Sequence, residues 1–190
     1  GEMNAYDYKK AVYRIARHEA GHWLAAYILG WDPKKIELKV PSSENSHYGY
    51  ALCAYKVNLE TIGDVRDYAR GRVKVLYCGA YADGYDGNNF DYERIGREMG
   101  RTGGAYSDFW KAEEIYFFYY NCLESKGDWE YEFNPIVNDV KLLVRMHHDF
   151  LDSVGNYAKD KALNIGDVIE ITPDTLKTLF IESKIRLPSY

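Results

Sequence analysis

The sequence has few cysteines, and their spacing excludes the common cysteine-based sites. Its three cysteines, Cys53, Cys78 and Cys122, lie far apart, and no CxxC pair occurs. A zinc finger built from paired cysteines is therefore excluded. An odd number of widely spaced cysteines, with no signal peptide before them, also gives no disulfide framework. We expect reduced thiols and a cytoplasmic protein.

The sequence also lacks an excess of positive charge and a long apolar run. Its 24 Lys and Arg residues against 29 Asp and Glu residues give a net charge of −5, so we expect no nucleic-acid partner. The apolar stretch WLAAYILGW is much shorter than the roughly 20 residues that a membrane-spanning helix needs, and its neighbours are polar. We therefore expect no membrane span in this chain.

What the sequence has is enough apolar material for one core. The chain has 190 residues, of which 46% are hydrophobic and 16% are aromatic, and this length favours one domain. We expect a single domain over residues 1–190, with the motif-bearing core in residues 1–125 and a helical C-terminal part in residues 126–190. The hydrophobic pattern predicts a mostly α fold (α+β) with a small β hairpin or sheet.

Apolar residues at spacings of three and four predict five helices. These helices are expected over residues 6–29, 62–84, 108–123, 135–161 and 173–184. Thr61 and Thr172 suit the N-caps of the second and the last helix, and Ser107 or Asp108 suits that of the third. Pro135 suits the first residue of the fourth helix.

Two strand-like runs follow the first predicted helix. They are KIELKV and YGYALCAYKV, and the polar loop PSSENSH between them predicts a hairpin. The stretches DGYDGNN and REMGRTGGAYS are rich in glycine and polar residues, and we expect them to be irregular.

The first predicted helix contains the motif HEAGH. His18 and His22 are four residues apart, so on a helix their side chains lie one turn apart on nearly the same face. Two imidazoles in that arrangement can bind one metal ion. Glu19 lies about 100° further round the helix, where it reaches a water on the metal rather than the metal itself. Chance predicts roughly 0.01 such motifs in a chain of this composition.

The chemistry of a zinc peptidase explains these residue types. Zinc lowers the pKa of a bound water and polarises a carbonyl oxygen. Glu19 then takes the proton of that water during attack on a peptide carbonyl and passes it to the leaving amine. The alternative is a hydrogen-bonded cluster of polar side chains in the core, which is disfavoured because a buried carboxylate without a partner is costly.

A zinc site of this kind needs a third protein ligand. The extended motif HExxHxxGxxH is absent. His47 falls in the predicted hairpin loop, and we expect His147 and His148, on the fourth predicted helix, to be structural. A carboxylate is therefore the expected ligand, and composition alone does not select one among the 29 Asp and Glu residues.

The segments around and after HEAGH resemble a known family. HEAGHWLAAYILG is similar to the HEAGHxxxAxxL helix in the peptidase domain of FtsH-type AAA proteases. DPKKIELKVPSSENSHYGYAL resembles the hairpin after that helix, VKVLYCGAYADGYDG resembles its GGRxAE segment, and GGAYSDFWKAEEI resembles its GAxxDLxxAT segment. The resemblance runs from Ala11 to Cys122, in the same order as in the family.

The resemblance implies a complete site. In the family, the aspartate of the GAxxDL segment is the third zinc ligand, and the matching residue here is Asp108. The implied ligands are His18, His22 and Asp108, with Glu19 as general base. A helix cap is the other role that suits Asp108. Asp83 matches the glutamate of GGRxAE and is either an alternative ligand or a carboxylate that holds an imidazole N–H.

The sequence also departs from the family pattern. Cys78 replaces the family's first glycine, Ala80 its arginine, and Ala112 with Glu113 its Ala-Thr pair. No GxxxxGK[ST] phosphate-binding loop is present, so no ATPase module is expected within this sequence. The expected substrate is a peptide or an unfolded protein, and a homo-oligomer or a separate unfoldase is the further partner to be considered.

The function that follows is a zinc-dependent metalloendopeptidase that binds Zn²⁺ and uses Glu19 as general base. Two alternatives stay open: a non-proteolytic interaction module that keeps the fold and the metal site, and a zinc hydrolase that cuts a different bond. The run YGYALCAYKV is a candidate strand for pairing with an extended peptide. It equally fits a core strand or a dimer-forming strand.

Overall fold

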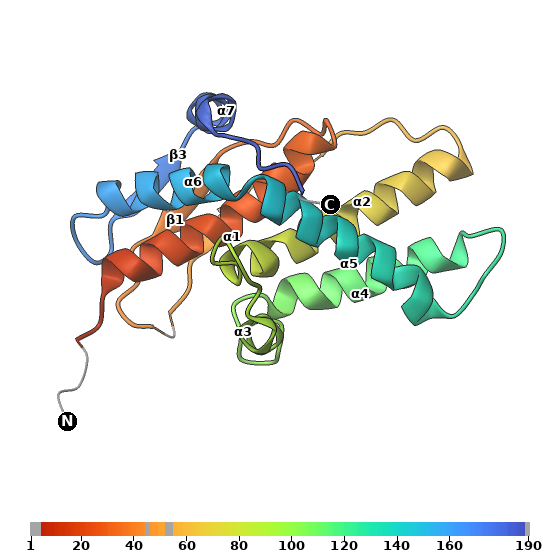
Figure 1. Ribbon diagram of the computed structural model, residues 1–190, viewed down its shortest axis with the longest axis horizontal. Helices are drawn as coiled ribbons and strands as arrows, with labels where there is room; N and C mark the ends of the chain where they lie inside the picture. The colour runs from red at the N-terminus through yellow and green to blue at the C-terminus, as the bar shows by residue number, and fades with distance from the viewer. Residues whose placement is uncertain (1–4, 45, 52–54, 189–190) are drawn as a thin grey trace.

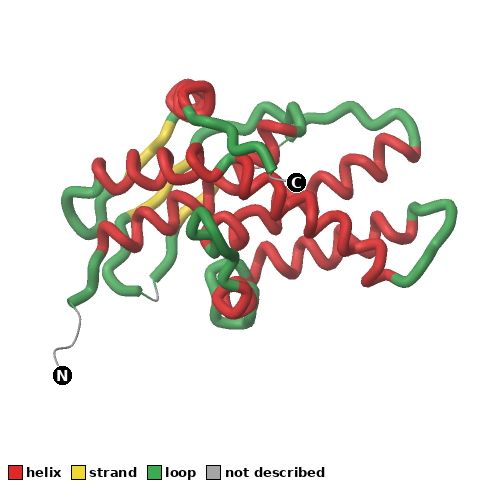
Figure 2. Tube along the Cα trace, in the orientation of Figure 1, coloured by secondary structure: helices red, strands yellow, loops and turns green. Residues whose placement is uncertain are grey.

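The computed structural model describes residues 5–44, 46–51 and 55–188. This part of the chain folds into helices and one small three-stranded antiparallel sheet (Figure 1, Figure 2), which confirms the predicted mostly α class. The elements in chain order are α1 (Tyr8–Ile28), β1 (Ile36–Lys39), β2 (Gly49–Ala51), α2 (Ile62–Asp83), α3 (Tyr92–Glu98), α4 (Tyr106–Asn121), α5 (Trp129–Met146), α6 (His148–Lys161), β3 (Val168–Ile171) and α7 (Pro173–Glu182). Within the described ranges, no helix is both long and apolar enough to cross a membrane.

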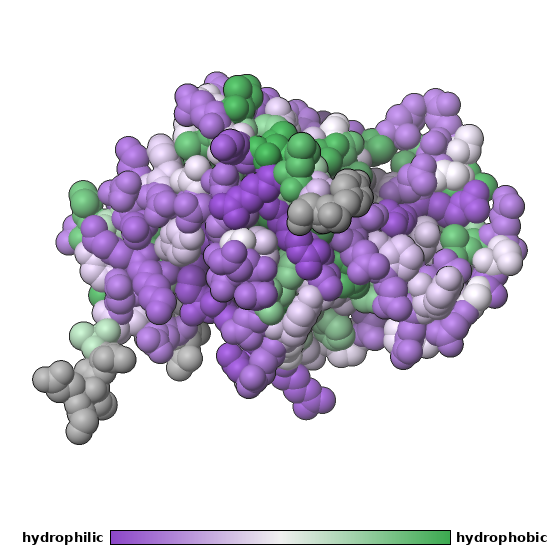
Figure 3. Space-filling model, in the orientation of Figure 1, coloured by the Kyte–Doolittle hydropathy of each residue, from purple (hydrophilic) through white to green (hydrophobic). Residues whose placement is uncertain are grey.

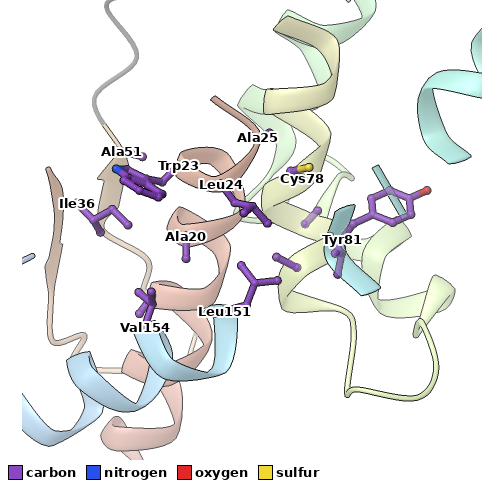
Figure 4. Packing of buried hydrophobic residues seen from close by; sticks show 14 of the residues in the cluster. Ala20, Trp23, Leu24, Ala25, Ile36, Ala51, Cys78, Tyr81, Leu151 and Val154 are labelled. Carbon is purple, nitrogen blue, oxygen red and sulfur yellow. The ribbon is translucent and has the colours of Figure 1, made fainter. Parts of the chain in front are cut away.

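The helix α1 lies at the centre of the molecule. α2, α6 and the sheet pack around it, and every residue from Ile15 to Ala26 is buried. Figure 4 shows the apolar side chains at this centre, among them Ala20, Trp23, Leu24, Cys78 and Leu151. Because the middle of α1 is almost completely shielded from bulk solvent, the polar side chains there need partners.

The backbones of α1 and α2 are in close contact at Gly21. A Cβ atom at this position would overlap the carbonyl oxygen of Cys78 and lie 2.8 Å from the Cβ of Ala82. A helix crossing as close as this requires a residue without a side chain. The crossing places the middle of α2 directly against the turn of α1 that carries His18 and His22.

The first predicted helix is confirmed as α1, and the predicted N-caps of α2 and α7 are confirmed as well. Thr61 accepts a hydrogen bond from the N–H of Asp64, whose carboxylate accepts one from the N–H of Thr61. This reciprocal pair is a capping box. Thr172 accepts from the N–H of Thr175, and Pro173 is the first residue of α7.

The predicted hairpin is confirmed as β1 and β2, and β3 completes the sheet. β1 lies in the middle and pairs antiparallel with both neighbours. Its inward side chains, Ile36 and Leu38, are fully buried. β3, which is only four residues long, was not predicted from the sequence. Because β3 comes from the C-terminal part, residues 126–190 are joined directly to the hairpin.

The predicted strand YGYALCAYKV is a strand over only part of its length. β2 covers Gly49–Ala51, and residues 55–57 form no strand. Residues 52–54 of this run, Cys53 among them, lie outside the described residues. The other two cysteines, Cys78 and Cys122, are free thiols.

The predicted start of the fourth helix at Pro135 is wrong. The helix α5 begins at Trp129, with the Asp128 side chain accepting from the N–H of Glu130, and Pro135 lies inside the helix. The first turns are stabilised by Phe133, whose ring packs edge-on at 5.4 Å from the ring of Tyr77. An aromatic contact of this kind between distant segments outweighs the local preference of proline for a helix start.

The predicted continuity of this helix to Lys161 is also wrong. α5 ends at Met146, and a separate helix, α6, begins at His148. α5 packs against α2, whereas α6 packs along α1. The break at His147 thus separates two helices that pack against different partners.

The segment that leads into α4 differs from the prediction. Part of REMGRTGGAYS, which was expected to be irregular, belongs to the end of α3 and the first turn of α4. An N-cap role for Ser107 or Asp108 is wrong, since the N-cap residue is Ala105, without a side-chain hydrogen bond. Asp108 lies in the first turn of α4, and its carboxylate contacts imidazole nitrogens of α1 instead.

The face of the molecule in Figure 3 is mostly polar. Apolar side chains gather on it near α7 and the segment that follows α7, where Ile181, Ile185 and Leu187 are exposed. The site described below lies in the interior, between α1, α2, α4 and the hairpin.

Candidate metal centre

Three donor atoms converge from two helices. His18 and His22 come from α1, and Asp108 comes from the first turn of α4. The two Nε2 atoms are 3.1 Å apart, and the Asp108 Oδ2 atom lies 3.2 Å from that of His18 and 3.1 Å from that of His22. Among the described His, Cys, Asp and Glu residues, these three form the group that could hold a metal ion.

The spacing of the donors fits a metal ion. Ligand atoms at about 2.0 Å from a tetrahedral ion are roughly 3.3 Å from one another, which is close to the three distances found here. Two unprotonated imidazole nitrogens at 3.1 Å repel each other, so a proton or a cation is needed among the three atoms. His18 and His22 are only 5% and 6% exposed, and water therefore screens that repulsion poorly.

A hydrogen bond to the backbone of α2 fixes the orientation of the His22 ring. Its Nδ1 lies 2.6 Å from the carbonyl oxygen of Val75 in α2. A carbonyl oxygen only accepts hydrogen bonds, so Nδ1 carries the proton and Nε2 presents its lone pair to the site. This is the arrangement that metal-binding histidines commonly have.

The backbone of Gly79 in α2 lies directly against the side chains of His18 and His22. A Cβ atom there would lie 2.5 Å from Nε2 of His22 and 2.8 Å from Nε2 of His18. Any side chain at this position would therefore occupy the space that the donor atoms need. In the sequence, Gly79 stands out only as the second glycine of the GGRxAE-like segment, and this contact gives a physical reason for a glycine there.

Charge couples Asp108 and His22. Burial would raise the pKa of the Asp108 carboxyl, but the charge of His22 and the hydrogen bonds with both imidazoles hold that pKa well below its usual range. Burial would likewise lower the pKa of His22, yet Asp108, Glu19 and the Val75 carbonyl raise it well above its usual value. Without a metal, the group therefore retains a proton that a metal ion must displace.

Glu19 lies beside the three donors but outside their group. It is 4% exposed, and its Oε1 is 3.8 Å from Nε2 of His47. Burial would raise the pKa of Glu19, but the contact with His47 and the charges of His18 and His22 lower it. The carboxylate is therefore ionised and can accept a proton.

β2 closes the space next to Glu19. A Cβ atom at Gly49 would lie 2.9 Å from Cγ2 of Ile15 and 3.3 Å from Oε1 of Glu19. Only a residue without a side chain allows this approach. Since β2 is one edge of the sheet, an edge strand lies next to Glu19.

Comparison with known proteins gives no family assignment. No family model matches the chain, and no curated protein matches it. The resemblance to FtsH-type peptidase domains therefore stays a prediction that rests on the quoted motifs.

His47 is part of the site, although the sequence analysis assigned it no role. The hairpin loop brings its ring to 5.6 Å from the ring of His18, in an edge-on arrangement. Its side chain is 30% exposed. The one sequence signal was a histidine in the loop between the two predicted strands, and local pattern does not show where such a loop folds.

The other candidate residues lie elsewhere. Both carboxylate oxygens of Asp83 accept from Nη2 of Arg94 at 2.8 Å, and Oδ1 is 3.4 Å from Nε of Arg14. The carbonyl of Val75, rather than Asp83, holds the imidazole N–H of His22. His147 stacks on Phe180 at 5.3 Å, and His148 packs edge-on against Tyr85 at 5.5 Å.

A cleft lies on the outer side of His47, and Glu19 is not among its lining residues. It has a volume of about 740 Å³ and lies between the N-terminal half of α1, the hairpin loop and the turn before α4. Its lining is rich in charged and polar side chains, including those of Lys10, Arg14, Glu44, His47 and Glu98. A molecule bound in the cleft would contact the hairpin loop beside Glu19.

Proposed function

We propose that the protein is a zinc-dependent metalloendopeptidase. The observation that carries this proposal is the convergence of His18, His22 and Asp108 with donor separations of 3.1–3.2 Å, next to the buried, ionised Glu19. Three protein ligands leave one position of a tetrahedral ion open, which is typical of catalytic rather than structural zinc sites. The likeness of the motifs to FtsH-type peptidase domains supports the same function.

The donor set favours zinc among the common metals. Two imidazole nitrogens and one carboxylate oxygen suit zinc, whereas magnesium and calcium prefer oxygen ligands alone. When bound, zinc would lower the pKa of a water molecule and polarise a carbonyl oxygen. The residues that would hold it are His18, His22 and Asp108.

The protein's own residues supply the remaining chemistry. Glu19 is buried, ionised and adjacent to the donors, so it can take a proton from an attacking water and release it to the leaving amine. The hydrogen bond from His22 to Val75 holds that imidazole in one orientation throughout. The absence of a side chain at Gly79 leaves room for the imidazoles of His18 and His22, and its absence at Gly49 leaves room for the Glu19 side chain.

The substrate we propose is an extended peptide segment. β2 forms one edge of the sheet in the described part of the chain, and it passes directly beside Glu19. An extended chain can add to such an edge through main-chain hydrogen bonds. The residues available in this sequence include no ATP-binding loop, so we propose peptides or flexible segments of proteins as substrates, with unfolding left to a homo-oligomer or a separate partner.

The test combines metal content with proteolysis. We expect one zinc per chain in the purified protein, and cleavage of casein that the Glu19→Gln variant loses while it keeps its zinc. Cleavage that is equally fast in Glu19→Gln would overturn the proposal. His22→Ala is the matched control, because it should lose both the metal and the activity.

The same experiment separates the alternatives. Full zinc occupancy with no turnover on casein or on a broad peptide library would favour a non-proteolytic module that binds a peptide or a protein partner. Turnover of ester or amide substrates other than peptides, lost in Glu19→Gln, would favour a zinc hydrolase that acts on a different bond.

A further inference from the structure

We propose that His47 is a positioning residue that holds the Glu19 carboxylate in its working orientation. This inference rests on the proposed peptidase function and assigns a role that HExxH itself does not include. The residue comes from the hairpin loop, 28 positions after Glu19 in the chain (47 − 19).

The first observation is the isolation of Glu19. The carboxylate is 4% exposed, and His47 is its partner among the ion pairs of the described residues, with Nε2 at 3.8 Å from Oε1. A buried carboxylate is stabilised by a neighbouring positive charge or an N–H donor. His47 is therefore the side chain that orients the base.

The second observation is that His47 is itself held in place. Its ring lies edge-on to that of His18, with centroids 5.6 Å apart. On the other side, a Cβ atom at Gly104 would lie 3.2 Å from Nδ1 of His47 and 3.3 Å from Oε2 of Glu98. The imidazole therefore occupies a slot between α1 and the turn before α4, and a side chain at position 104 would crowd it.

The third observation is that Gly49 belongs to the same segment of the hairpin as His47. Its backbone limits the movement of the Glu19 side chain, since a Cβ there would already be 3.3 Å from both Cγ and Oε1 of Glu19. The segment 47–49 thus restricts the Glu19 carboxylate in two ways. The backbone of Gly49 packs closely against the Glu19 side chain, and the His47 imidazole makes a polar contact with Oε1. Proton transfer requires the base within hydrogen-bond reach of its partner, so confinement of this kind favours catalysis.

A role for His47 as a fourth zinc ligand does not fit the geometry. The group whose donor atoms lie within 4.8 Å of one another comprises His18, His22 and Asp108, and His47 is not a member. The imidazole faces Glu19 on one side and the cleft on the other. It therefore acts on the metal site through Glu19.

The first arm of the test is spectroscopic and does not need activity. In the zinc-loaded protein, we expect the ring ¹⁵N resonances of His47 to shift in the Glu19→Gln variant, while those of His148, which lies away from the site, stay unchanged. Unchanged His47 resonances would overturn the proposal.

The second arm is kinetic. We expect His47→Ala to lower kcat by about 10- to 100-fold with little change in KM and with full zinc content, and His47→Gln, which retains an N–H donor, to recover most of the loss. Ser43→Ala, in the same loop, is the matched control and should match the wild type. Wild-type kcat in His47→Ala, or equal losses in the Ala and Gln variants, would contradict the positioning role.

The two arms separate this inference from the function on which it rests. If the wild-type protein holds zinc but cleaves no peptide, the peptidase proposal fails, and the resonance shift still decides whether His47 and Glu19 are coupled. Should His47→Ala fail to fold by circular dichroism, His47→Gln together with the resonances of the wild type and Glu19→Gln decides the outcome.

Discussion

The backbone of Gly79 lies directly behind His22, so close that a Cβ atom would be 2.5 Å from Nε2. This nitrogen is thus packed between a second helix and the donor atoms of His18 and Asp108, and its position depends on the crossing of α1 and α2. We draw four predictions from this arrangement and from the charges around it.

Gly79→Ala is expected to abolish tight zinc binding, because the new methyl group would displace the Nε2 atoms of His18 and His22. Zinc stoichiometry after gel filtration measures the effect. The matched control is Gly96→Ala, since a Cβ at Gly96 meets nothing within 4 Å. Retention of one zinc per chain in Gly79→Ala would show that the donors can shift without loss of the site.

Asp108→Asn is expected to weaken zinc binding by at least about 100-fold, since loss of a partner outside the ligand shell already costs about 10- to 100-fold. The substitution keeps the shape of the side chain and removes the charge. Competition with a coloured chelator measures the affinity. Asp160→Asn, on the exposed side of α6, is the control and should bind zinc as the wild type does.

The metal-free protein is expected to be most stable at intermediate pH. The pKa of His22 is raised in the folded state, so its contribution is complete below the unfolded pKa and is lost as the pH rises through the folded pKa. The pKa of Asp108 is depressed, so its contribution is present above the unfolded pKa and is lost as the pH falls through the folded one.

The measurement is Tm by circular dichroism in the presence of a chelator, as a function of pH. Asp108→Asn should make Tm depend less on pH at both low and high pH, because it removes the charged partner of His22. A wild-type curve that is already flat, or one that Asp108→Asn leaves unchanged, would show that the pair does not contribute in this way.

Asp83→Asn is expected to keep one zinc per chain and to lower stability by about 2 kcal/mol, the scale of hydrogen bonds to charged groups. The Asp83 side chain is 8% exposed and pairs with Arg94 and Arg14 rather than with a histidine. Zinc analysis and chemical denaturation measure the two effects. Loss of zinc in a folded Asp83→Asn variant would instead support the alternative in which Asp83 is a zinc ligand.

The part of the site that the sequence predicts is the part that lies within one helix. His18, Glu19 and His22 are set by helical spacing, and α1 confirms their relative placement. Asp108, 90 positions from His18, was reached only through a resemblance between motifs, because no local pattern shows which of many carboxylates returns to the first helix.

The residues that the sequence analysis left without a site role depend on contacts between distant segments. Gly79, Val75 and His47 meet the site because α2 and the hairpin pack against α1. The same reason explains the errors in the fold. Phe133 extends α5 beyond the start expected at Pro135, and β3 forms because β1 offers it an edge.

The three candidate donor residues span a long stretch of the chain, and this has a mechanical consequence for a bound ion. An ion held by His18 and Asp108 would join two points 90 positions apart, so it would act as a cross-link that closes a large loop. Such a link limits the freedom of the unfolded chain more than one within a single helix would. Bound metal would therefore hold the first turn of α4 against α1. The backbone amide hydrogens of that turn would then exchange with solvent more slowly in the metal-loaded protein than in the metal-free protein.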